Sequence, residues 1–143
     1  MTQTETDQSW MTLRVTYGLI PVLAGLDKFL NLLTDWTRYL SPAIANVLPV
    51  SAPTFMRVVG VIEIAVGILI LTRWTRLGAY IASAWLVLIA LNLLISGSYF
   101  DIAVRDLAMA VGAWTLARLS SGRDAYESRA RSSAHTENMH ARA

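Results

Sequence analysis

The amino-acid sequence predicts an all-α integral membrane protein, a four-helix bundle with spans at about 12–33, 55–72, 77–96 and 101–119. Hydrophobic residues make up 55% of the 143 residues, above the roughly 45–50% that is usual in soluble domains. They are gathered into four runs, and about 20 apolar residues in a helix match the thickness of a bilayer. Arginines flank these runs, which is typical of membrane topology.

The composition excludes several kinds of cofactor site. The sequence contains no cysteine, which rules out disulfides, iron–sulfur clusters and zinc thiolate sites. Both histidines, His135 and His140, lie in the polar C-terminal region, so no span offers a histidine ligand to haem. The net charge of +2 comes mostly from arginines beside the runs. We therefore expect a lipid bilayer, and no nucleic acid, as partner.

The first span carries charges and small residues on one helical face. Arg14, Gly18, Pro21, Gly25 and Lys28 follow one another at helical spacing. Small residues allow close approach of a second backbone, and such stripes are where helices meet in lipid. This face is therefore expected to be both a packing surface and the position of charged groups.

The longest connection, residues 34–54, contains aromatic and apolar residues at helical spacing. Because Trp and Tyr favour the membrane interface, this pattern predicts a short interfacial helix, interrupted before Pro42. A turn around Pro49 and Pro53 follows. An irregular loop is the alternative interpretation.

The second span has a single carboxylate, Glu63, at its centre, on one face with Gly60 and Gly67. A charge near the middle of a bilayer costs about 2.5–3.5 kcal/mol even on the gentler insertion scales. Glu63 is therefore expected to face a charged partner, a protonation site or a water-filled cavity.

The third and fourth spans add further polar groups. Asn92 is the only amide at depth in the third span, and Arg105 and Asp106 open the fourth. Because these two charges shorten the apolar part of the fourth run, a three-span protein with an interfacial last helix is an alternative. Residues 120–143 have no apolar periodicity and are predicted to be a disordered cytoplasmic tail of a domain covering 1–119.

Four spans place both termini and the turn at residues 72–76 on one side of the membrane, and that side carries more arginine than the other. Because basic residues are more frequent on the cytoplasmic side, both termini are predicted to lie in the cytoplasm. In this orientation, four polar residues lie about 7–9 Å from the membrane midplane toward the outer face, if each helical residue rises about 1.5 Å. They are Lys28, Asn92, Arg105 and Asp106. Glu63 lies at the floor of this group, and these five residues form the candidate binding site.

Two interpretations of this cluster remain open. The first is purely structural: Glu63 pairs with Arg105 or Lys28, Asp106 pairs with the other cation, and the pairs fix helix register. The second is functional: the charged groups line a pocket for a proton, an anion or a quinone-like head group.

Three short motifs resemble the DoxX-like membrane proteins. They are Gly25-Leu26-Asp27-Lys28-Phe29 in the first span, Gly60-Val61-Ile62-Glu63 in the second, and Arg105-Asp106-Leu107-Ala108-Met109 in the fourth. The resemblance implies a small multi-pass four-helix bundle of the bacterial inner membrane. Some members are associated with thiosulfate oxidation coupled to quinone, and others with oxidative-stress resistance.

The resemblance favours a redox-linked membrane subunit for which a quinone is the candidate cofactor. Lys28 and Arg105 would stabilise a quinone oxygen or an anionic sulfur substrate, and Glu63 or Asp106 would exchange protons. Because the chain has no redox-active thiol, electron transfer would need a bound quinone or a redox partner subunit. A homo-oligomer, a small proton-coupled transporter and an assembly subunit without catalysis of its own are the alternatives.

Overall fold

The computed structural model describes residues 3–140, and the long elements of that range are all α-helices. The elements follow in the order α1 (Gln3–Leu30), η1 (Trp36–Tyr39), α2 (Pro42–Ala45), α3 (Ala52–Leu71), α4 (Thr75–Ser96) and α5 (Phe100–His140). This confirms the all-α fold class. By length and composition α3 and α4 are able to cross a membrane, whereas the crossing by all four long helices stays a prediction.

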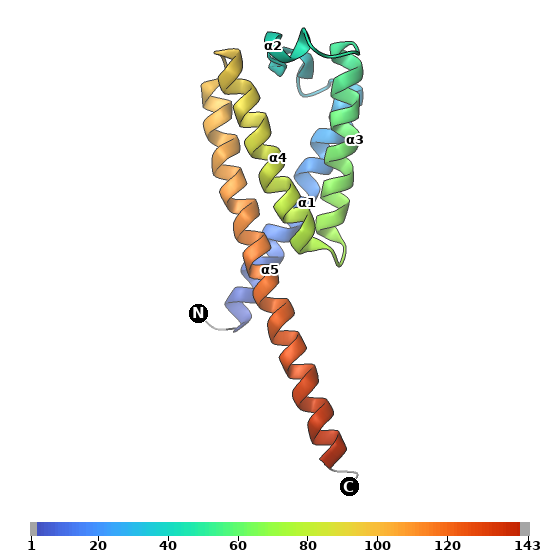
Figure 1. Ribbon diagram of the computed structural model, residues 1–143, viewed down its shortest axis with the longest axis vertical. Coiled ribbons are helices and arrows are strands. Elements are labelled where there is room, and N and C mark those ends of the chain that lie inside the picture. Colours follow the sequence, from blue (N-terminus) through green and yellow to red (C-terminus); the bar gives the residue numbers. More distant parts are fainter. Residues whose placement is uncertain (1–2, 141–143) are drawn as a thin grey trace.

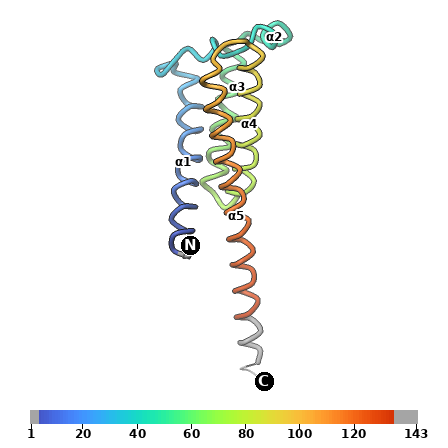
Figure 2. Tube along the Cα trace, turned by 90° about the vertical axis from the view of Figure 1, so that its left-hand side faces the viewer, coloured from blue at the N-terminus to red at the C-terminus, as the bar shows by residue number. Residues whose placement is uncertain are grey.

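The long helices form two antiparallel pairs. α1 packs along α3, and α4 packs along α5. The pairs meet near the α3–α4 turn and diverge toward the end where α2 lies (Figure 1). The N-terminus and the extension of α5 lie at the opposite end, as both views show (Figures 1 and 2).

Glycines bring the backbones of α1 and α3 together. A Cβ atom added to Gly25 would lie 2.5 Å from the carbonyl oxygen of Gly60, and one added to Gly60 would lie 2.6 Å from that of Gly25. Gly18 and Gly67 meet in the same way, since a Cβ atom on Gly67 would lie 2.5 Å from the Gly18 oxygen. The predicted small-residue faces of the first and second spans are thus one shared interface.

The narrow end of the bundle holds the main hydrophobic core. Here α4 and α5 contribute mostly alanine, which lets the helices approach closely, and α3 contributes larger side chains. The core residues are Val66, Ile70, Ala79, Ala82, Ala113, Leu116 and Ala117.

Arg14 of α1 closes the C-terminal end of α3. Its guanidinium donates to the carbonyl oxygens of Ile70, Leu71 and Thr72. These oxygens have no hydrogen-bond donor within the helix, so the guanidinium supplies their hydrogen bonds. Its positive charge also interacts favourably with the negative end of the helix dipole.

The connection between α1 and α3 covers the wide end with two short helices. The predicted interfacial helix is divided at the predicted interruption, because Ser41 caps α2 and Pro42 begins it. In η1, the hydroxyl and the backbone N–H of Thr37 donate to Asp35 and hold the pKa of its carboxyl below the ordinary value.

The helix ends differ from the predicted span boundaries. α1 begins at Gln3, before the predicted start at residue 12, and ends at Leu30, because Asn31 adopts a φ of 50°. Gly97 ends α4 in the left-handed conformation, with a φ of 68°, which glycine adopts without steric cost.

The sequence predicted a disordered tail for residues 120–143, whereas α5 continues as a helix to His140. Residues 141–143 lie outside the described part of the chain. Helical neighbours of opposite charge support this extension, since Arg123 and Arg131 both pair with Glu127. The first turn beyond the bundle is also attached to α1: Trp10 donates to the Ser120 hydroxyl, and Arg123 pairs with Asp7. Apolar periodicity does not predict this part of α5, because pairs of opposite charge stabilise the helix here.

We predict that Gly60→Ala lowers the free energy of unfolding by about 1–3 kcal/mol, the usual cost of overpacking a well-packed contact. The new methyl group would meet the backbone carbonyl oxygen of Gly25 in α1, which moves only if the two helices separate. Denaturant titration of the detergent-solubilised protein measures this change.

Gly122→Ala is the matched control, because a Cβ atom there meets nothing within 4 Å. It should leave stability unchanged or raise it by up to about 1 kcal/mol. Equal effects of the two substitutions would contradict close packing at Gly60.

Candidate functional site

A cavity of about 710 Å³ lies between the two helix pairs, beneath η1 and α2. Its walls are mainly apolar side chains from all four long helices. The structure brings all five sequence-predicted site residues to its wall, namely Lys28, Glu63, Asn92, Arg105 and Asp106. Their role in binding stays a prediction, but their convergence is a property of the fold.

An ion pair between Lys28 of α1 and Glu63 of α3 forms one wall. Lys28 Nζ lies 2.6 Å from Glu63 Oε2, and the two side chains are only 4% and 9% exposed. Of the two partners considered for Glu63, Lys28 is therefore the one that the structure shows.

The antiparallel helices direct these two side chains toward each other. Lys28 is three residues beyond Gly25 and Glu63 is three beyond Gly60, so their Cα atoms are about 9 Å apart along the helix axes. Each Cα–Cβ bond tilts toward the N-terminus of its own helix. Lys28 therefore leans toward the narrow end and Glu63 toward the wide end, and the two long side chains close the gap.

Trp36 of η1 covers the Lys28 ammonium. Lys28 Nζ lies 3.7 Å from the centroid of the indole ring, within the range of a cation–π interaction. The indole N–H donates to Asp27 Oδ2 at 2.8 Å. Asp27 also accepts from the backbone N–H groups of Leu32 and Leu33, so the end of α1, Trp36 and the ion pair are one connected network.

Asn92 of α4 holds the connection over the cavity. Its Oδ1 accepts from Ser41 N at 3.0 Å, and its Nδ2 donates to Tyr39 O at 2.7 Å. Tyr39 packs edge-on against Tyr99 at 4.9 Å. Because both ends of the amide have backbone partners, Asn92 positions the cover of the cavity.

Asp106 and Arg105 of α5 differ in burial although they are neighbours. The Asp106 side chain is 10% exposed and that of Arg105 is 66% exposed, with Arg105 Nε 3.7 Å from Asp106 Oδ1. This distance is too long for a hydrogen bond. Glu63 thus pairs with Lys28, and Asp106 pairs with Arg105. This is one of the two arrangements expected from the sequence.

Trp85 of α4 lines the cavity, and its indole N–H is buried. Its indole N–H lies beside the Glu63 carboxylate, but among the described residues no acceptor meets hydrogen-bond geometry. A buried N–H without an acceptor is costly. An oxygen acceptor that reached this N–H would satisfy it.

The cavity is suited to a neutral ligand that is largely apolar and has a few polar oxygens. The lining cations Lys28 and Arg105 are paired with the carboxylates of Glu63 and Asp106, so the four groups sum to a formal charge of zero. An anion would have to compete with carboxylates that are already in place. A carbonyl oxygen would need only donors such as Lys28 and Trp85.

Sequence reasoning missed the parts played by Trp36 and Trp85. Trp36 lies in the connection between the first two spans, and no spacing rule joins it to Lys28 across a loop. Trp85 shares a helical face with Asn92. That shared face was the signal available for placing it in the polar group.

Comparison with known families gives a match over more than half of the chain. A family model described as DoxX matches residues 9–95. The matched segment includes Lys28, Glu63, Trp85 and Asn92 and ends before Arg105. No curated protein and no solved structure matches this chain.

We predict that Lys28→Met lowers the free energy of unfolding by about 3–5 kcal/mol, because it leaves Glu63 buried without its cation. The double variant Lys28→Met, Glu63→Met removes both charges and should recover most of this loss. Yield from the membrane and denaturant titration in detergent measure both effects.

Arg105→Met is the control for charge removal, since that side chain is mostly exposed and its pairing is expected to contribute less than about 1 kcal/mol. If the double variant is no more stable than Lys28→Met alone, the ion pair does not have the energetic role described here.

Proposed function

The chain belongs to the DoxX family, and from this premise we propose that it is a redox-linked membrane protein whose central cavity binds a quinone head group. The observation that carries the proposal is the convergence of a buried ammonium, an unpaired indole N–H and two carboxylates on one apolar cavity. Small-molecule sites commonly have this composition and volumes of roughly 300–1,000 Å³.

The chain's own residues have separate tasks in this proposal. Lys28 and Trp85 donate to a quinone carbonyl oxygen, while the Trp36 ring covers Lys28 and excludes water. Glu63 and Asp106 exchange the two protons that accompany two-electron reduction of a quinone to a quinol. The two electrons come from a redox partner subunit or another external donor.

The charge balance favours a quinone over thiosulfate as the occupant of this cavity. Thiosulfate is a dianion, and entry beside two ion pairs would add negative charge to a site of low dielectric constant. Oxidation of a sulfur compound fits better on a partner subunit, with electrons passing to the quinone. A role in oxidative-stress resistance would use the same quinone chemistry.

A proton-coupled transporter is less well supported. That function favours a membrane carboxylate without a fixed counter-charge, whereas Glu63 lies 2.6 Å from Lys28. An assembly subunit without catalysis would be favoured if neutralising the cavity charges left quinone binding and redox activity intact.

We propose further that the protein crosses the bacterial inner membrane four times with both termini in the cytoplasm. Arginine supports this orientation. Arg14 binds the C-terminal end of α3, and Arg73 and Arg76 lie at the turn between α3 and α4. Arg118 directly follows the narrow-end core residues Leu116 and Ala117 of α5. The wide end, with η1 and α2, would then face outward.

We predict that Trp85→Phe weakens binding of a short-chain quinone analogue about fivefold, since one neutral hydrogen bond contributes about 1 kcal/mol. Titration calorimetry of the full-length protein in lipid nanodiscs measures the dissociation constant. Trp114→Phe is the matched control, because this half-exposed indole lies outside the cavity lining. Non-saturable binding, or equal weakening by both variants, would contradict the quinone site.

The absence of cysteine from the sequence allows a direct test of orientation. In intact cells, Val47→Cys in the exposed connection should react with a membrane-impermeant maleimide. Ala130→Cys on the α5 extension should react only after the inner membrane is permeabilised. Labelling of Ala130→Cys alone in intact cells would reverse the orientation, and labelling of both would contradict the three crossings proposed between these two positions.

A further inference from the structure

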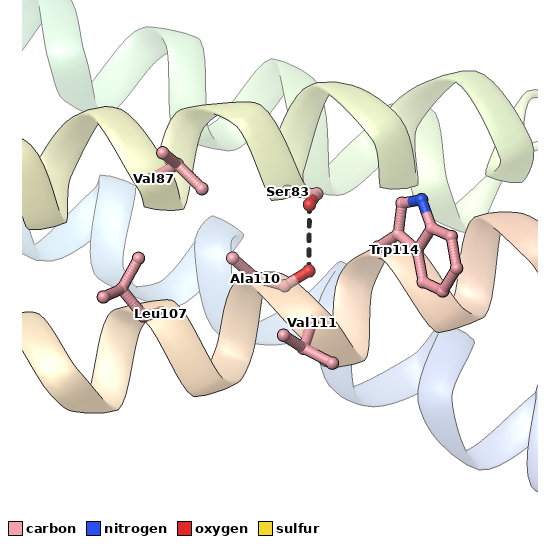
Figure 3. A pocket seen from close by; sticks show the side chains of 6 residues that line it. All are labelled: Ser83, Val87, Leu107, Ala110, Val111 and Trp114. Carbon is pink, nitrogen blue, oxygen red and sulfur yellow. Dashed lines mark hydrogen bonds between the residues drawn. The ribbon is translucent and has the colours of Figure 1, made fainter.

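A second hollow lies on the outside of the bundle, between α4 and α5 (Figure 3). It is a shallow groove of about 300 Å³, and none of its lining residues lines the central cavity. The groove is lined by Ser83, Val87, Leu107, Ala110, Val111 and Trp114.

The surface of this groove is hydrocarbon in character. Its one hydroxyl, that of Ser83, donates to the Ala110 carbonyl oxygen at 2.9 Å (Figure 3). This bond uses the donor within the protein and ties α4 to α5. Val111 and Trp114 are 64% and 50% exposed, so the groove faces the surroundings of the bundle and fits an apolar chain better than a polar ligand.

Two arginines continue the groove toward the narrow end of the bundle. Arg118 follows Leu107, Val111 and Trp114 at helical spacing on α5, and its guanidinium lies 5.7 Å from the centroid of the Trp114 ring. On α4, Arg76 precedes Ser83 and Val87 by seven and eleven residues, which places the three on one face. Both arginines are exposed.

Neither arginine is neutralised within the described part of the chain. The ion pairs among residues 4–134, whose side chains the structure describes, involve neither Arg76 nor Arg118. Arg76 lies in the first turn of α4, one of the two helices able to cross a membrane. In a helix that crosses a membrane, the first turn lies near the lipid phosphates.

We propose that the α4–α5 groove binds one anionic phospholipid from the membrane. Its phosphate lies between Arg76 and Arg118, the Trp114 indole lies at the level of the ester groups, and one acyl chain follows the groove to Leu107. Arg118 and Leu107 are about 16 Å apart along α5 at 1.5 Å per residue. This matches the roughly 15 Å of hydrocarbon in one leaflet.

The proposal depends on the membrane location of the chain and not on quinone binding. Aromatic residues favour the interface, and each basic residue near the surface raises the affinity for anionic lipid about fivefold. This groove is apolar, its one hydroxyl is already hydrogen-bonded, and two arginines without an ion-pair partner lie at one end. This combination distinguishes it from an ordinary lipid-exposed surface.

The test is native mass spectrometry of the full-length protein, extracted in mild detergent and titrated with phosphatidylglycerol or with phosphatidylcholine of the same acyl chains. Wild type should retain one phosphatidylglycerol in preference to phosphatidylcholine. The double variant Arg76→Gln, Arg118→Gln should reduce that preference about tenfold or more.

Arg73→Gln combined with Arg129→Gln removes the same net charge away from the groove and should keep the preference. Val111→Trp fills the groove at an exposed position without changing charge, and should lower retention of phosphatidylglycerol. An unchanged preference in Arg76→Gln, Arg118→Gln, an equal loss in the control pair, or full retention by Val111→Trp would each overturn the proposal. Thermal unfolding of every variant verifies that it is folded.

Discussion

The ion pair between Lys28 and Glu63 is the interaction on which the rest of the structure depends. It exists because Gly25 and Gly60 let the backbones of α1 and α3 touch, and because the N-terminal tilt of both side chains directs them toward each other. A charge buried in a membrane helix is tolerated only with a partner. The pair therefore fixes the register of α1 against α3 and also places polar groups in the wall of the central cavity.

The second helix pair completes the site from the other side. α4 and α5 join α3 in the alanine-rich core at the narrow end and diverge from the α1–α3 pair at the wide end, so the space between the pairs remains open beneath the connection. Asn92 and Trp36 then attach that connection to the bundle. The result is a covered, apolar cavity of zero formal charge, which favours a neutral molecule with carbonyl oxygens.

Much of this arrangement was predictable from the sequence, because depth in a membrane helix follows from counting residues. Counting placed Lys28, Asn92, Arg105 and Asp106 at one level, and the structure brings them to one cavity. Counting did not distinguish Lys28 from Arg105 as the partner of Glu63, since both lay at similar depth. The glycine contact between α1 and α3 makes that choice. The helix beyond residue 119 was missed because charge pairs stabilise it without apolar periodicity.

Photoaffinity labelling with an azido-quinone in native membranes, followed by peptide mass mapping, tests the central claim most directly. If the cavity binds the quinone head group, the label will be on α1 near Lys28 or on α4 near Trp85. An excess of unmodified quinone will suppress it. Label confined to lipid-facing positions such as Leu23 or Val104, and unaffected by competing quinone, would contradict a quinone site between the two helix pairs.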